Sequence, residues 1–324
     1  MENTITLKII LKKDCFDYKV LNGFIALNLI DFKNIRYKVG NKPAKELSFT
    51  EEKFDKTLND LLKTENRFIF EAYDNQYDFR LPKKDNSYLV SFSFSVEKFL
   101  QNKTQLFSLI DEVFNKDLAY VAFACHYNDI TWQNMDDLEY IKAKNQPYEH
   151  LKLIPHPYFK EQMIVDIEQN AGHSHMVDDL WFGSCWAMWF GKDYYNYISE
   201  TAIESFKDGF ENVQLENGAR RILLYKDIFD YDNSENRKIQ QRFREVTGMD
   251  IVAHELMKKP PKDVDPTIEI LNGNFEHGGT KIMKRYLDSQ NEMIEKSKAV
   301  KVEVREFIVI ENRWKTVSKE IVDI

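Results

Sequence analysis

The stretch that decides the fold is WFGSCWAMWFGKDYYNY, Trp181–Tyr197, in which eight of seventeen residues are aromatic and which contains three of the five tryptophans. Apolar surface this large is stable only in a core or against a partner. Within it, Trp186–Phe190 is a short apolar run between two glycines. Alternate side chains of a strand point to opposite faces, and here both faces are apolar. We therefore expect a buried central strand.

Upstream of this run, period-2 and helical patterns alternate. Ile5, Leu7, Ile9 and Leu11 alternate with polar residues, as in a half-buried strand. Asn22-Gly23 predicts a turn before a second strand, Phe24–Ile30. The further expected elements are a helix after a capping box at Ser48–Glu51, a hairpin of strands 67–73 and 77–81, a strand at 88–94, a helix through 106–113 and a strand at 118–125.

Downstream of it, turn and cap signals are clearer. Asn217-Gly218 predicts a hairpin between strands 213–216 and 220–225. Ser234–Thr247 has an apolar helical stripe, and Gly248 fits its C-cap. Three further elements are expected: a helix from Ser199 to Phe206, a helix at 281–296, and a hairpin that pairs 300–310 with the strand from Trp314 onward.

These patterns predict an α+β protein with mixed or antiparallel sheets and helices packed on one side. Two breaks divide it, a proline-containing stretch at 142–157 and the charged, proline-rich segment 258–266. We expect an N-terminal α+β domain at 1–145, a second α+β domain at 158–257, and a small subdomain or extension at 267–324. The first two are similar-sized halves.

Composition restricts the function. The 324 residues have a net charge of −8, whereas a nucleic-acid binder normally has a basic excess. No apolar run is long enough to span a membrane and no export signal is visible, so we expect a cytoplasmic protein with neither a nucleic-acid nor a membrane partner. The three cysteines, Cys15, Cys125 and Cys185, are far apart and form no CxxC pair. No catalytic set and no cofactor motif is apparent.

One cluster resembles a metal site. His173-Ser-His175 places two imidazoles on one side of an extended segment, and Asp178 and Asp179 follow closely. The pattern is similar to the HxHxDH motif of metallo-β-lactamase-type hydrolases, but the spacing differs by one residue and the final His is replaced by Asp. No later histidine clearly supplies a second metal site, although His254 and His277 are available. A solvated polar loop explains the same residues, so a metal-dependent hydrolase is the alternative function.

Two other segments contain charged or glycine residues near helix starts. Asp227, Asp230 and Asp232 lie in the sequence DIFDYDN, which is either a plain structural connection or an acidic surface for a basic partner. Glu276-His277-Gly-Gly-Thr280 could bind an anion at a helix N-terminus, although a tight turn capped by Thr280 is the simpler interpretation.

Four segments resemble immunity proteins of bacterial polymorphic toxin systems. They are AYVAFACHYNDITWQN (119–134), WAMWFGKDYYNYI (186–198), LENGARRILLYKDIFDYDN (215–233) and EHGGTKIMKRYLD (276–288). The resemblance implies a non-enzymatic, cytoplasmic protein of bacterial competition, which binds a cognate toxin and occludes its active site. It implies no catalytic residues.

An acidic inhibitor suits a basic toxin such as a nuclease, because charge complementarity steers the encounter. The residues expected at the interface are the acidic Asp227, Asp230, Asp232 and Glu235 and the aromatic Trp132 and Tyr231.

Overall fold

The structure is a computed structural model that describes residues 4–16, 19–40, 42–65, 67–83, 87–156, 162–177, 179–258, 266–272, 280–310 and 313–324. The chain divides into two compact units, Met1–Lys258 (unit 1) and Lys259–Ile324 (unit 2). The α+β class is confirmed. None of the described helices is long and apolar enough to cross a membrane.

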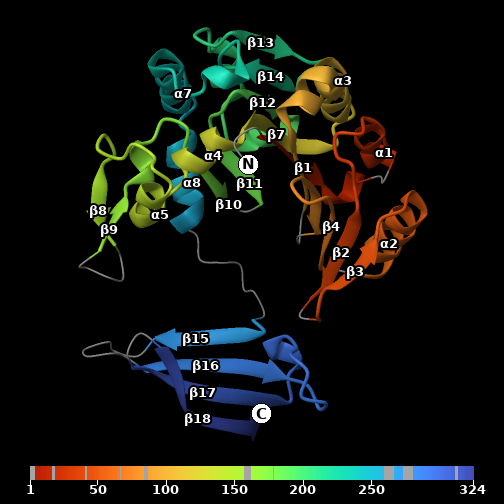
Figure 1. Ribbon diagram of the computed structural model, residues 1–324, viewed down its shortest axis with the longest axis vertical. Coiled ribbons are helices and arrows are strands. Elements are labelled where there is room, and N and C mark those ends of the chain that lie inside the picture. Colours follow the sequence, from red (N-terminus) through yellow and green to blue (C-terminus); the bar gives the residue numbers. More distant parts are fainter. Residues whose placement is uncertain are drawn as a thin grey trace. The chain divides into compact units, whose positions relative to one another are not determined.

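Unit 1 is built on one ten-stranded sheet in which every neighbouring pair is antiparallel (Figure 1). Its strand order is β13 (Glu211–Gln214), β14 (Arg220–Leu223), β12 (Ala187–Phe190), β7 (Ala119–His126), β1 (Thr4–Lys12), β6 (Ser87–Ser95), β5 (Asp78–Lys83), β4 (Phe68–Tyr73), β2 (Asn34–Val39) and β3 (Lys45–Ser48).

The two halves expected at 1–145 and 158–257 are therefore not separate domains. Strand β7 of the first half pairs directly with β12 of the second, from Val121–Phe190 to Ala124–Ala187. The stretch at 142–157, expected as a linker, lies within unit 1. It contains the end of the short helix α5 (Leu138–Ala143), which follows α4 (Tyr127–Gln133), and strand β8 (Leu153–Pro155), which pairs with β9 (Met163–Val165).

The aromatic stretch forms the core, as expected. Trp186 and Trp189 are fully buried, and all four residues of β12 are buried. The indole Nε1 of Trp189 donates a 2.7 Å hydrogen bond to Asp111 Oδ1. Strand β1 is buried along nearly its whole length rather than half-buried, because it lies between β7 and β6 in the middle of the sheet.

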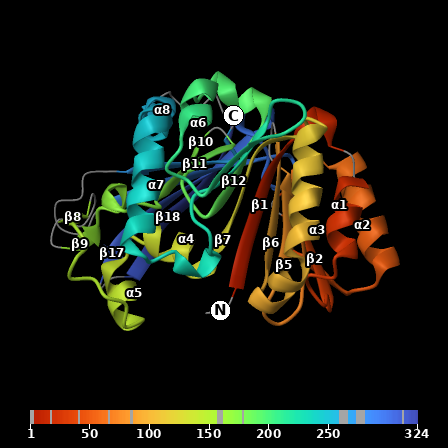
Figure 2. The same ribbon diagram turned by 90° about the horizontal axis from the view of Figure 1, so that it is seen from above.

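Helices α1 (Lys19–Ala26), α2 (Glu51–Thr64) and α3 (Val96–Asn115) gather on one side of the sheet (Figure 2). Phe107 of α3 packs against Trp186 and Trp189. On the other side, Phe123 of β7 stacks on Trp181 of the hairpin β10 (Ser174–Val177)–β11 (Leu180–Gly183), with ring centroids 4.2 Å apart. Helices α7 (Ser234–Thr247) and α8 (Met249–Lys258) lie on that side. Helix α7 contacts α6 (Glu200–Ser205), and α8 packs on β10 and β11.

Several local expectations are confirmed. Gly218, with φ of +91°, lies in the turn between β13 and β14, and Gly248, with φ of +65°, ends α7. Ser199 caps α6 through Ala202 N–H. The hairpin of β4 and β5, the strands β6 and β7, and helix α3 also form where they are expected. The cap of α2 is Thr50, whose hydroxyl accepts from Lys53 N–H, and Ser48 instead ends β3.

The expected strand at Phe24–Ile30 is wrong, because Asn22-Gly23 lies inside helix α1. Leu21 and Phe24, three residues apart, are both buried on one face of this helix. A Cβ at Gly23 would come within 2.9 Å of Leu109 in α3. The glycine therefore allows close approach of two helices rather than forming a turn.

Unit 2 is a four-stranded antiparallel sheet in the order β15 (Ile268–Asn272), β16 (Thr280–Leu287), β17 (Lys301–Ile310) and β18 (Arg313–Asp323). The expected hairpin of the last two strands is confirmed. The helix expected at 281–296 is wrong, because β16 is hydrogen-bonded to β15 on one side and β17 on the other.

Candidate functional site

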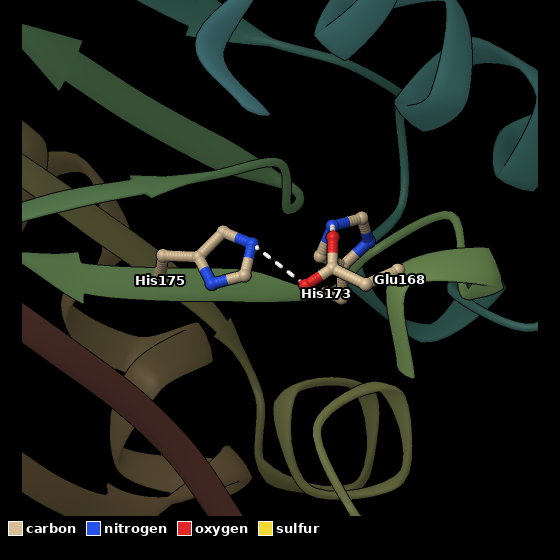
Figure 3. A group of neighbouring side chains, drawn as sticks. All are labelled: Glu168, His173 and His175. Carbon is tan, nitrogen blue, oxygen red and sulfur yellow. Dashed lines mark ion pairs between the residues drawn. The ribbon is translucent and has the colours of Figure 1, made fainter. Parts of the chain in front are cut away.

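The histidine cluster forms where three segments meet. Glu168 lies in the 3-10 turn Ile167–Gln169, and His254 lies in α8. His173 directly precedes β10, and His175 is its second residue. Figure 3 shows the imidazole of His175 directed toward the carboxylate of Glu168. The two atoms, His175 Nε2 and Glu168 Oε1, are 3.3 Å apart. Glu168 Oε2 lies 3.2 Å from His173 Nε2 and 3.4 Å from His254 Nε2.

The cluster is partly shielded from solvent. His173 is 2% exposed and the His175 side chain 10%, whereas the side chains of Glu168 and His254 are 36% and 46% exposed. Potential ligand atoms of Glu168, His173 and His175 all lie within 4.8 Å of one another. Such a set of imidazoles and one carboxylate is a typical donor set for zinc and similar cations.

Arg244 adds a positive charge beside His173. Its guanidinium donates hydrogen bonds to the backbone carbonyl and Nε2 of His173 and to Asp250 Oδ1. Arg244 makes a second hydrogen bond to Asp250, from Nε to Oδ2 at 3.2 Å. Burial lowers the pKa of Arg244 to about 10, so it stays protonated at neutral pH and is balanced by Asp250.

Hydrogen bonding and burial set the state of the imidazoles. His173 Nδ1 lies 2.6 Å from the carbonyl oxygen of Asn170, which can only accept, so Nδ1 donates and Nε2 carries the lone pair. Burial lowers the pKa of His173, and the charge of Arg244 lowers it further. Burial also lowers the pKa of His175. Both imidazoles are therefore neutral at neutral pH.

Glu168 remains ionised in this environment. Burial acts to raise the pKa of its carboxyl group, but the charge that the adjacent histidines carry when protonated and a hydrogen bond with His254 outweigh burial and lower it. The cluster thus combines one carboxylate with neutral nitrogen donors.

The structure brings together only part of the expected metal set. His173 and His175 are adjacent, with ring centroids 5.3 Å apart. Asp178 lies outside the described residues. Asp179 lies in the β10–β11 turn with φ of +64° and does not belong to the described group of ligand atoms, in which Glu168 takes its place. Sequence reasoning missed Glu168, although its position five residues before His173 was a usable signal.

The acidic segment Asp227–Glu235 is exposed and locally rigid. Asp227 caps the 3-10 turn Ile228–Asp230 by accepting from Phe229 N–H, while Ile228 is buried beneath it. Asp227, Asp230, Asp232 and Glu235 are all exposed. Glu235 pairs with Lys238 at 2.7 Å, but within the described part of the chain no ion pair involves the three aspartates.

The two aromatic residues expected at the interface are only partly exposed. Tyr231 stacks on His126, with ring centroids 4.8 Å apart and planes 15° apart. Trp132 packs against a small cluster of Leu138, Ile141 and Val165. Phe229, which was not expected at the site, is 38% exposed in the middle of the acidic segment.

The glycine-containing candidate is for the most part not described. Glu276, His277 and the two glycines lie outside the described residues. Thr280 begins strand β16, so it is not the N-cap of a helix. Because a strand and not a helix begins at Thr280, this position cannot bind an anion at a helix N-terminus.

Comparisons with known proteins assign no family. No family model matches the sequence, and no curated protein matches it significantly. Among solved structures, the chain is similar to the Pseudomonas aeruginosa T6SS protein PA0821, with a TM-score of 0.37 and 10% identity over 80% of this chain and 88% of the other. At that TM-score the likeness establishes neither a shared fold nor a function.

Proposed function

We propose that this protein is a non-enzymatic immunity protein that binds a cognate bacterial toxin and occludes its active site. The observation that supports the proposal is the exposed acidic segment Asp227–Glu235, whose three aspartates have no described cationic partner and which presents Phe229 at its centre. The buried Ile228 of the 3-10 turn and the stacked Tyr231–His126 pair anchor the segment to the rest of unit 1 before binding. Preformed surfaces lose less conformational entropy on association.

The chemistry of the segment favours a basic partner. Carboxylates in the same exposed segment as an aromatic ring can provide both electrostatic steering and an apolar anchor. A basic nuclease is a toxin of this kind. The net charge of −8 adds a long-range electrostatic attraction toward a basic partner.

The first test is co-expression with the product of the neighbouring gene. Growth rescue together with a stable stoichiometric complex supports the proposal. A toxic neighbour that is neither rescued nor bound contradicts it.

The second test locates the interface by charge reversal. The triple variant Asp227→Lys, Asp230→Lys and Asp232→Lys should slow association with the toxin by roughly tenfold or more and make binding less sensitive to salt. A matched control reverses three exposed acidic residues elsewhere in unit 1, namely Glu52, Asp60 and Glu149. An equal loss of association rate in both variants would show that only net charge matters and would contradict the placement of the acidic segment at the interface.

A metal-dependent hydrolase is a second candidate, favoured by the placement of His173 and His175 beside Glu168. Hydrolysis would need a coordination position that is open to water and substrate. A catalytic cation at this cluster would keep one coordination position for water, whereas a structural cation would have all of its positions filled by protein ligands.

A further inference from the structure

We propose that Glu168, His173 and His175 bind a divalent transition-metal cation of the zinc class, with His254 as the fourth ligand. The resulting site is structural, and it joins the 3-10 turn at Ile167–Gln169 to β10 and α8. This inference is independent of the proposed immunity function, since it concerns a different set of residues.

Spacing between the donor atoms is the main support. Zinc bonds of about 2.0–2.1 Å in a tetrahedron place neighbouring ligand atoms about 3.4 Å apart. The three Nε2 atoms lie 3.2, 3.3 and 3.4 Å from the oxygens of Glu168. The rings of His175 and His254 are 5.2 Å apart, and those of His173 and His175 are 5.3 Å apart. Each nitrogen is thus at coordination spacing from one oxygen of Glu168, and the ligand atoms of Glu168, His173 and His175 lie within 4.8 Å of one another, a group that His254 joins only after its side chain adjusts.

The buried nitrogen of His175 is an independent indication. Its Nε2 is inaccessible to solvent and makes no hydrogen bond, although it lies 3.3 Å from Glu168 Oε1. Buried polar atoms usually have a partner, and leaving one without a partner is costly. A cation between His175 and Glu168 would satisfy this nitrogen.

His173 is oriented as a metal ligand. Its Nδ1–H donates to the Asn170 carbonyl, which leaves the lone pair on Nε2, the nitrogen that accepts from Arg244 and lies 3.2 Å from Glu168 Oε2. A hydrogen bond of this kind from the second ring nitrogen is typical of metal-binding histidines.

Arg244 is the group that a cation must displace from His173 Nε2. The guanidinium retains two alternative acceptors, the carbonyl oxygen of His173 and the carboxylate of Asp250. Asp250 also neutralises its charge, which limits repulsion toward a bound cation. Displacement therefore removes one hydrogen bond while Arg244 remains paired.

The fourth ligand distinguishes a structural site from a catalytic one. His254 Nε2 is 3.4 Å from Glu168, and its half-exposed side chain can adjust without disturbing the core. Four protein ligands leave no position for water, as in structural zinc sites. The site would then hold α8 and the β10–β11 hairpin in register on the sheet.

The test uses the full chain purified without a histidine tag. Elemental analysis and competition titration with Zn²⁺ should show one equivalent per chain. Cobalt substitution should give the intense visible absorption of a four-coordinate site. Failure of the wild-type protein to bind one equivalent of either cation would overturn the proposal.

Variants identify the ligands. Glu168→Gln and His175→Ala should each weaken Zn²⁺ binding by at least ~100-fold, more than typical losses of outer-shell partners. His150→Ala, an exposed histidine outside the cluster, should leave the affinity unchanged. Equal affinity in Glu168→Gln and wild type would mean adventitious binding and refute the site. Glu168→Gln nearly preserves shape at a partly exposed position, so it remains informative if His175→Ala fails to fold.

His254→Ala tests the fourth position. We expect weaker Zn²⁺ binding and a changed Co²⁺ spectrum as water replaces the imidazole. An unchanged affinity and spectrum would refute the closed, structural site.

Discussion

Asp129 shows how strongly a single residue can control this fold. It is 1% exposed in α4 and is held by Arg237 at 2.5 Å, Tyr225 Oη at 3.2 Å and Gln240 Nε2 at 3.4 Å. Burial raises the pKa of this carboxyl group, and the charge of Arg237 opposes the effect. The pair connects α4 to α7, two helices more than a hundred residues apart in the chain.

We expect Asp129→Ala to lower the free energy of unfolding by about 3–5 kcal/mol, because it leaves the Arg237 charge without its carboxylate and the buried Tyr225 hydroxyl without its acceptor. Urea denaturation measures the change. The control is Glu139→Ala, which removes a carboxylate from an exposed pair with Lys142 and should cost roughly 0.5 kcal/mol or less. Similar losses in the two variants would show that the buried network contributes no more than a surface ion pair.

The candidate metal site was partly predictable from single residues. Alternation placed His173 and His175 together, and local spacing is enough for that step. His254 reaches them only because α8 packs on β10, a contact between segments about eighty residues apart. The environment of Arg244 and Asp250 likewise depends on the α7–α8 junction. Tertiary contacts of this kind leave no periodic signal in the sequence.

At the scale of elements, strands with clean alternation and helices with clear caps were predicted correctly. Helix α7 and the β13–β14 hairpin are examples, since the glycines at 248 and 218 predict a helix end and a turn, and both have positive φ. Helix α1 and strand β16 were not. In α1 the Asn-Gly pair serves helix packing instead of a turn, and β16 obtains its structure from pairing with both neighbours. Tertiary context overrode local preference in both cases.

The sheet of unit 2 is organised around one buried carboxylate. Glu303 in β17 is 5% exposed and accepts from Arg305 Nε at 2.6 Å and Arg285 at 3.3 Å, with Lys319 Nζ at 3.0 Å. Burial acts to raise its pKa, but the hydrogen bonds and charges of Arg305 and Lys319 outweigh burial and lower the pKa to about 2. Three strands are linked through this residue.

A depressed pKa in the folded state stabilises unit 2 above the ordinary glutamate value of 4.5, and this contribution is lost as the pH falls toward about 2. Glu303→Gln should destabilise unit 2 by about 2 kcal/mol at pH 7 and reduce its acid sensitivity in that window. Hydrogen exchange of β17 amides at several pH values measures both effects. Glu320→Gln, on the exposed strand β18, is the control. Parallel pH profiles for wild type and Glu303→Gln would contradict the prediction.

At the scale of the whole molecule, one core contains nearly all of the buried apolar side chains. It extends from Ile5 to Leu256, within unit 1. The central strand pair β7–β12 connects the parts of unit 1 that the sequence predicted as separate domains. Proline-containing composition at 142–157 indicated a boundary, but strand pairing across the sheet has no local signature. The division of the chain was thus predictable near residue 258 and not near residue 150.

Two truncations test this organisation. Residues 1–258 alone should fold, with an unfolding midpoint within roughly 3 °C of the corresponding transition in the full chain, because their core is complete. Residues 1–150 should not fold cooperatively, since the cut removes β12, β13 and β14 and leaves the edge of β7 that pairs with β12 without a neighbouring strand. Circular dichroism and calorimetry measure both outcomes. A cooperative transition in the 1–150 fragment would restore the two-domain interpretation, and loss of folding in 1–258 would show that the core of unit 1 requires unit 2.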